Sequence, residues 1–175
     1  GHGPPPTGKM LARGVRPSLS VDVVSSVPGE MFTQMRTALA YDRILEFTDT
    51  PDVAFAPTLT HRDVLEFATI DGASSIGLEE TTGSLTPGKQ ADIVLLNVQA
   101  INTAPMVDPM GTIVVFSDTS NVDSVFVAGK AVKRGGKLLD ADLDSVFAKL
   151  DASRNHILGQ GELLPDWAAE PAAAV

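Results

Sequence analysis

The sequence predicts an α/β chain, with a strand, a loop and a helix near its start, a small antiparallel sheet in its middle and a helix near its end. Polar and apolar residues alternate over residues 15–24, which is the period of a strand, whereas apolar residues recur at helical spacing over residues 30–47. Short β-rich runs separated by turn residues follow between residues 91 and 132. The chain has 175 residues, of which 43% are hydrophobic, so it can fill a core.

The first element expected is a short helix that Thr7 caps and that stops at Gly14, a residue type suited to a left-handed helix end. The strand over residues 15–24 follows, and it places Asp22 near its C-terminal end. Ser, Val, Pro and Gly at residues 25–29 then predict a turn.

Two helices are expected next. The first covers residues 30–47, and a loop rich in Pro and Asp over residues 48–59 ends it. The second begins at Thr60, because Asp63 three residues later completes a capping box, and it is expected to continue to Gly77. The strand and the first of these helices form a β/α unit.

The second half of the chain predicts a small antiparallel sheet or half-sandwich, followed by a helix over residues 140–158. Turn residues separate the expected strands. These strands cover residues 91–98, 112–116, 122–127 and 131–132. The last residues, 168–175, form a Pro- and Ala-rich tail with little to bury.

Composition excludes several classes of function. The chain has 13 Lys and Arg against 22 Asp and Glu, and this net charge of −9 disfavours nucleic acid, whose binding depends on displacing counterions with cations. There is no cysteine, hence no disulfide and no thiolate metal site, which fits a cytoplasmic protein. The longest uncharged run, residues 93–107, is too short to cross a bilayer, so no membrane span is expected.

The most specific motif is the run from Gly83 to Asp92, GSLTPGKQAD, which resembles the C-terminal signature of the metal-dependent amidohydrolase superfamily. Residues 122–132 look like the closing hairpin of that superfamily. Residues 19–22 together with residues 31–36 look like the last barrel strand and helix of its cytosine deaminase and chlorohydrolase branch. The resemblance covers roughly residues 3–139.

This resemblance implies the C-terminal fragment of a (β/α)8 TIM barrel and part of a composite β-sandwich. A complete barrel takes about 250 residues, so we expect the chain to be part of a larger enzyme. The implied domains are the last β/α units of the barrel, a sandwich segment, a C-terminal helix and a flexible tail. They cover residues 1–78, 79–139, 140–159 and 160–175 in that order.

Within the motif, Pro87 and Gly88 are suited to a tight turn, since proline fixes φ and glycine tolerates positive φ. The segment then leads into an apolar strand. We therefore interpret Lys89 and Asp92 as architectural and not catalytic.

Asp22 is the acidic residue expected at a strand end, where barrel enzymes carry their catalytic groups. The resemblance implies that Asp22 binds a divalent metal, expected to be zinc, takes a proton from the attacking water and passes it to the leaving group. The alternative is that Asp22 closes its strand by hydrogen bonding to the turn at Ser25 and Ser26. Many members of the branch have Gly-Thr or Gly-Ser before this aspartate, whereas this chain has Ser20-Val21.

A metal site of this type needs several histidines, and the chain has three, His2, His61 and His156, which share no motif. Surface or hydrogen-bonded roles are expected for His61 and His156. His2 and Ser25 are candidate substrate contacts. The alternative for His2 is a mobile terminus, and for Ser25 a turn residue.

The implied parent activity is hydrolysis of carbon–nitrogen bonds other than peptide bonds, by deamination or dechlorination of a cyclic amidine or aminated heterocycle with metal-activated water. We expect the 175-residue chain alone to be inactive, because it lacks the histidine ligands. Expected partners are a small heterocyclic substrate and further copies of the chain, as a homo-oligomer. The alternatives are a non-catalytic sandwich module for interaction or oligomerisation, and a cyclic-amide or dipeptide hydrolase of the same superfamily.

Overall fold

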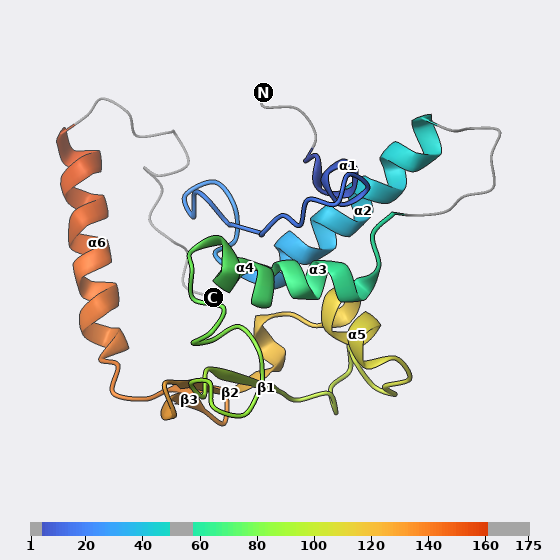
Figure 1. The fold of residues 1–175 in the computed structure, drawn as a ribbon. Coiled ribbons are helices and arrows are strands. Elements are labelled where there is room, and N and C mark those ends of the chain that lie inside the picture. The colour runs from blue at the N-terminus through green and yellow to red at the C-terminus, as the bar shows by residue number, and fades with distance from the viewer. Residues whose placement is uncertain (1–4, 50–57, 161–175) are drawn as a thin grey trace. The chain divides into compact units, whose positions relative to one another are not determined.

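The structure is a computed structural model that describes residues 5–49 and 58–160. The chain divides into two compact units, Gly1–Leu139 and Asp140–Val175. The first unit contains short and long helices followed by a small sheet, and the second contains one long helix (Figure 1). The predicted mixture of helices with a small antiparallel sheet is therefore confirmed. No helix in the described ranges has the length and apolar character needed to span a membrane.

Four helices form the N-terminal part of the first unit, namely α1 (Thr7–Leu11), α2 (Met31–Asp49), α3 (His61–Phe67) and α4 (Ile70–Ser75). The predicted capping box at the start of α3 is confirmed. The Asp63 backbone N–H donates to the Thr60 hydroxyl at 3.2 Å, and the Thr60 N–H donates to the Asp63 carboxylate at 2.9 Å. Each donor would otherwise be an unpaired N–H of the first helical turn.

The single helix expected from Thr60 to Gly77 is wrong, because the chain breaks between α3 and α4. Thr69 has φ −130° and ψ −94°, well outside the helical region. Its hydroxyl donates to the Leu65 carbonyl at 2.7 Å, and its backbone N–H bonds to Glu66 instead. The threonine side chain thus occupies the acceptor that a continuing helix would use.

The strand expected over residues 15–24 is also wrong. No strand is assigned there, and no described strand of this chain pairs with it. The segment instead bonds to a helix end, where the Leu19 N–H donates to the Phe67 carbonyl at 3.3 Å. Alternating polarity alone does not make a strand, because strands are stabilised by a neighbour that satisfies their backbone groups.

The sheet has four antiparallel strands in chain order, β1 (Ile93–Leu96), β2 (Val122–Val127), β3 (Lys130–Arg134) and β4 (Lys137–Leu138). The expected hairpin between β2 and β3 is confirmed, with Val127 paired to Lys130 across a two-residue turn. Both turn residues, Ala128 and Gly129, have positive φ, which is the geometry that matches the twist of the flanking strands.

Residues 112–116, expected as a strand, form a π-helix, η1 (Thr112–Phe116), that continues from α5 (Pro109–Gly111). Asp108 caps α5, because its carboxylate accepts from the N–H groups of Met110 and Gly111 at 3.1 and 3.0 Å. Proline at the first helical position is compatible with this start. The cap therefore overrides the β propensity of the Ile, Val and Phe residues that follow.

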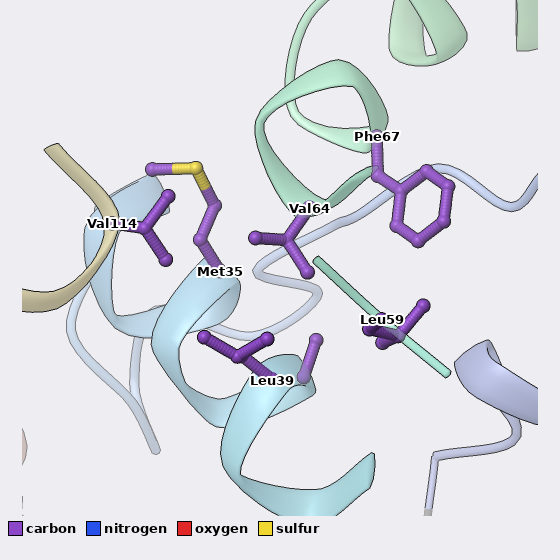
Figure 2. Packing of buried hydrophobic residues seen from close by; sticks show 7 residues of the cluster. Met35, Leu39, Leu59, Val64, Phe67 and Val114 are labelled. Carbon is purple, nitrogen blue, oxygen red and sulfur yellow. The ribbon is translucent and has the colours of Figure 1, made fainter. Parts of the chain in front are cut away.

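The core of the first unit lies between α2, α3 and η1 (Figure 2). Its buried hydrophobic members are Met35, Ala38, Leu39, Leu59, Val64, Phe67 and Val114. The members from α2 and α3 have the helical spacing by which the sequence predicts a buried face. Val114 comes from η1, which the sequence predicts as a strand.

The second unit contains α6 (Leu143–Gln160), which confirms the predicted terminal helix. Its apolar side chains are exposed within the described residues. These side chains are Leu143, Val146, Phe147, Leu150 and Ile157. Their spacing gives the helix an apolar stripe.

Candidate functional site: Asp22 on a strained turn

Asp22 lies at the centre of a γ-turn. Its φ is +61°, and the N–H of Val23 donates to the carbonyl of Val21 at 2.8 Å across it. A γ-turn with positive φ at its centre is the rarer and more strained of the two forms. The Asp22 N–H donates to the Ser20 hydroxyl at 3.1 Å, so hydrogen bonds fix the backbone on both sides of the Asp22 Cα.

The Asp22 side chain is exposed, and within the described part of the chain its carboxylate accepts no hydrogen bond and forms no ion pair. The alternative that it bonds to the turn at Ser25 and Ser26 is therefore not realised. Positive φ in a residue other than glycine persists only where the surroundings enforce it, and such positions cluster at functional sites. A free carboxylate on an enforced turn can act as a metal ligand or accept a proton.

The backbone that leads to Asp22 is held by Arg16. The guanidinium lies 2.9 Å from the Asp71 carboxylate and 2.7 Å from that of Glu66, on α4 and α3. It also lies 5.3 Å from the centre of the Phe67 ring. The hydrogen bond to Asp71, followed by the charges of the surrounding carboxylates, raises the pKa of Arg16. Because Arg is planar and forked, it can join several partners at once and tie the segment to two helices.

The other candidate residues are not brought together with Asp22. Ser25 lies in the turn after Asp22, exposed, and its hydroxyl has no hydrogen-bond partner among residues 5–49 and 58–160. His2 lies outside the described residues. His61 lies 3.4 Å from the Asp108 carboxylate, which confirms the polar role expected of it, and His156 is exposed on α6.

The fit of a metal can be tested on this donor set. A carboxylate without protein partners suits a divalent cation, so Asp22 can supply one ligand. Among the described residues no group of three His, Cys, Asp or Glu side chains could complete such a site. The described part of the chain therefore offers a single ligand, not a coordination sphere.

The motif around residues 83–92 is architectural, as predicted. The Asp92 carboxylate accepts from the Thr82 hydroxyl at 2.7 Å and from the Ala128 N–H at 2.6 Å, and so joins the motif to the β2–β3 turn. The Lys89 ammonium donates to the backbone carbonyls of Glu79 and Thr82. Both charged side chains are thus engaged in holding loops.

We expect Asp92→Asn to reduce stability more at neutral pH than in acid. The N–H of Ala128, and then the Thr82 hydroxyl, lower the pKa of Asp92 below its usual 3.8. A carboxylate whose pKa is lower in the folded than in the unfolded state stabilises the fold at pH values above its unfolded-state pKa. This stabilisation is lost as the pH falls through the folded-state pKa. Urea unfolding at about pH 6 and about pH 3 should show a larger difference in unfolding free energy between wild type and variant at the higher pH. An advantage that is equal at both pH values would contradict this role.

A separate hollow of about 500 Å³ lies beside α5 and η1, and Asp22 does not line it. Two of its polar side chains, Asp108 and Asn102, already have structural partners. Asp108 caps α5, and the Asn102 amide donates to the Phe116 carbonyl and to Asn121 at 2.9 and 2.8 Å. The hollow therefore adds no group to the Asp22 site.

A family model described as the amidohydrolase family matches residues 2–132. The chain belongs to the amidohydrolase family. The match covers the segments on which the resemblance to this superfamily rests, namely the Asp22 turn, the motif at residues 83–92 and the β2–β3 hairpin. The family assignment made from the sequence is confirmed.

Among curated proteins, the chain is 31% identical over 154 residues to a 5-methylthioadenosine/S-adenosylhomocysteine deaminase of Desulforudis audaxviator, covering 87% of this chain and 34% of the relative. It is 33% identical to a 5'-deoxyadenosine deaminase of Methanothermobacter thermautotrophicus, with 88% and 34% covered. The chain thus spans about a third of the length of the curated relatives it matches.

Among solved structures, the chain matches an adenosine deaminase from Xanthomonas campestris with bound zinc. The TM-score is 0.78 at 27% identity, and the match covers 88% of this chain and 34% of that chain. An atrazine chlorohydrolase from Arthrobacter aurescens complexed with zinc matches with a TM-score of 0.72 at 21% identity, covering 84% and 31%. This second likeness shows the fold alone.

Two residues of the site were missed from the sequence. Ser20 was noted only as a departure from the usual pattern, although a serine two residues before an aspartate is a known turn signal. Arg16 was missed because its partners Glu66 and Asp71 lie 50 and 55 residues away in the sequence. No local pattern marks a long-range ion pair of this kind.

Proposed function

We propose that this chain is the C-terminal part of a metal-dependent hydrolase that deaminates or dechlorinates a cyclic amidine or aminated heterocycle. The observation that carries the proposal is Asp22, whose carboxylate has no partner among residues 5–49 and 58–160 and lies on a turn that two hydrogen bonds enforce. Membership of the amidohydrolase family, and the deaminases among its relatives, support this class of chemistry.

In this proposal Asp22 supplies one ligand to a divalent metal, which we expect to be zinc. A cation of this kind lowers the pKa of water and so supplies a nucleophile at neutral pH. The Asp22 carboxylate would accept a proton from the attacking water and pass it to the departing amine, which leaves as ammonia. In dechlorination the chloride would leave as the anion, and the proton would pass to solvent. His2 and Ser25 are proposed substrate contacts.

For the architecture, we propose that residues 1–78 form the last β/α units of a TIM-like barrel, to which residues 5–49 and 58–78 contribute the helices α1–α4 but no assigned strand. We propose that residues 79–139 form part of a β-sandwich. The small antiparallel sheet supports the second assignment, since it falls within those residues. Residues 140–159 would be the C-terminal helix and residues 160–175 a tail.

The test is Asp22→Asn in the whole protein to which this chain belongs, with ammonia release from adenosine-type nucleosides and chloride release from chlorinated triazines as assays. Asparagine keeps the shape but cannot take up the proton, so kcat should fall about 10²- to 10⁴-fold. Bound zinc, measured by mass spectrometry, should fall as well.

The matched control is Asp144→Asn, which removes one carboxylate from the first turn of α6 and should leave activity and zinc unchanged. Full activity and full zinc content in Asp22→Asn would overturn the proposal. A whole protein that binds no metal and releases neither product would favour the non-catalytic module instead.

A further inference from the structure

The turn at Asp22 depends on a side chain two residues earlier. Ser20 accepts the Asp22 N–H through its hydroxyl at 3.1 Å, and the Val23 N–H to Val21 carbonyl bond closes the turn at 2.8 Å. The bond to Ser20 uses a side chain, whereas the Val23–Val21 bond joins two backbone groups. A substitution at Ser20 can therefore remove one of the two hydrogen bonds of the turn.

The turn would not form readily without such help. Positive φ is unfavourable for any residue with a Cβ, and an aspartate adopts it when local hydrogen bonds compensate. Exposed turn amides can bond to water instead, which allows other backbone conformations. A hydroxyl two residues back offers the amide a fixed acceptor and selects one of these conformations.

The segment before Ser20 is itself anchored. Leu19 donates its N–H to the Phe67 carbonyl at 3.3 Å, and Arg16 binds the carboxylates of α3 and α4. Ser20 therefore follows directly on a fixed backbone and links that fixed point to Asp22. The carboxylate has no described partner of its own, so the position of the backbone determines where it is presented.

We propose that Ser20 is a positioning residue for Asp22, whose hydroxyl holds the Asp22 amide and so presents the free carboxylate to the metal. This inference rests on the proposed function. It assigns to Ser20 no contact with substrate or metal. It predicts that the hydroxyl matters through the hydrogen bond it accepts, so that threonine can replace serine and alanine cannot.

The first experiment measures the hydrogen bond directly on the 175-residue chain, by the NMR solvent-exchange rate of the Asp22 amide. Ser20→Ala should raise this rate about 3- to 10-fold, and Ser20→Thr should keep it near the wild-type rate. Ser25→Ala is the matched control, because it removes a hydroxyl without a described partner from the same turn region. Equal rates in wild type and Ser20→Ala would overturn the inference.

The second experiment measures the consequence in the whole protein. Ser20→Ala should weaken zinc binding about 10-fold in competition with a chelator, and should lower kcat with little change in KM, because residues that orient a ligand act on the metal and not on substrate affinity. Ser20→Thr should restore both. Unchanged zinc affinity and kcat beside faster amide exchange would overturn the positioning role.

The two proposals fail in different ways. If Asp22→Asn keeps its zinc and activity, the proposed function fails, whatever the Asp22 amide does in Ser20→Ala. If Asp22→Asn loses both while Ser20→Ala keeps both, the proposed function stands and the role of Ser20 is refuted.

Discussion

Gly83→Ala is expected to destabilise the first unit by about 2–4 kcal/mol, a large fraction of the stability of a small domain. Gly83 has φ +84°, which is unfavourable for alanine, and a Cβ there would lie 2.7 Å from the Ala73 Cβ and 3.0 Å from the Ile70 Cα. Neither neighbour is the end of a flexible side chain, so α4 itself would have to move. Urea unfolding followed by circular dichroism measures the loss.

Gly88→Ala is the matched control within the same motif. Gly88 has φ +98°, but a Cβ there would meet nothing within 4 Å. Alanine at this position should therefore lower the unfolding free energy only by the cost of a positive φ for a residue with a Cβ, about 1–2 kcal/mol. Equal losses at Gly83 and Gly88 would show that contact with α4 is not why the motif requires its first glycine.

Local signals predicted much of the fold. The capping box at Thr60 and Asp63, the face of α2 and the β2–β3 hairpin all lie within a few residues of the signals that predict them. Each rests on hydrogen bonds or on a side-chain period that neighbouring residues determine. These elements are the ones for which the structure agrees with the sequence.

The errors have identifiable physical causes. The π-helix over Thr112–Phe116 was expected as a strand because its residues are apolar and β-branched, although Asp108 and Pro109 before it form a helix start. The strand at residues 15–24 was expected from alternation, but pairing depends on neighbours that a local pattern does not contain. The break at Thr69 depends on one side-chain hydrogen bond.

The candidate site was predictable in type but not in geometry. The resemblance to the superfamily singled out Asp22, and its carboxylate has no partner in the part of the chain that the structure describes. Its γ-turn could not be read from the sequence, because positive φ in aspartate follows from the hydrogen bond to Ser20 and from the anchoring of residues 16–19 on α3 and α4. That anchoring joins residues far apart along the chain.

Phe67 connects this anchoring to the core. It is the last residue of α3, and its side chain is fully buried (Figure 2). The Arg16 guanidinium lies over its ring, and its carbonyl accepts the Leu19 N–H. Loss of the ring would leave a cavity in the cluster and remove the surface on which Arg16 lies. The effect should therefore extend beyond the core to the segment that carries Asp22.

Phe67→Ala should cost about 3–5 kcal/mol of unfolding free energy, and Phe67→Leu markedly less, because leucine fills most of the space. Phe116→Ala removes a ring that is 58% exposed and serves as the control, with a small expected loss. In Phe67→Leu, where the unit stays folded, the Leu19 amide should exchange faster with solvent, since its acceptor lies on the disturbed turn of α3. An unfolding free energy equally reduced by Phe67→Ala and Phe116→Ala would contradict the central place of Phe67. An unchanged exchange rate of the Leu19 amide would show that packing of Phe67 does not stabilise the segment that carries Asp22. The Arg16 ion pairs would then be the main contacts that hold this segment.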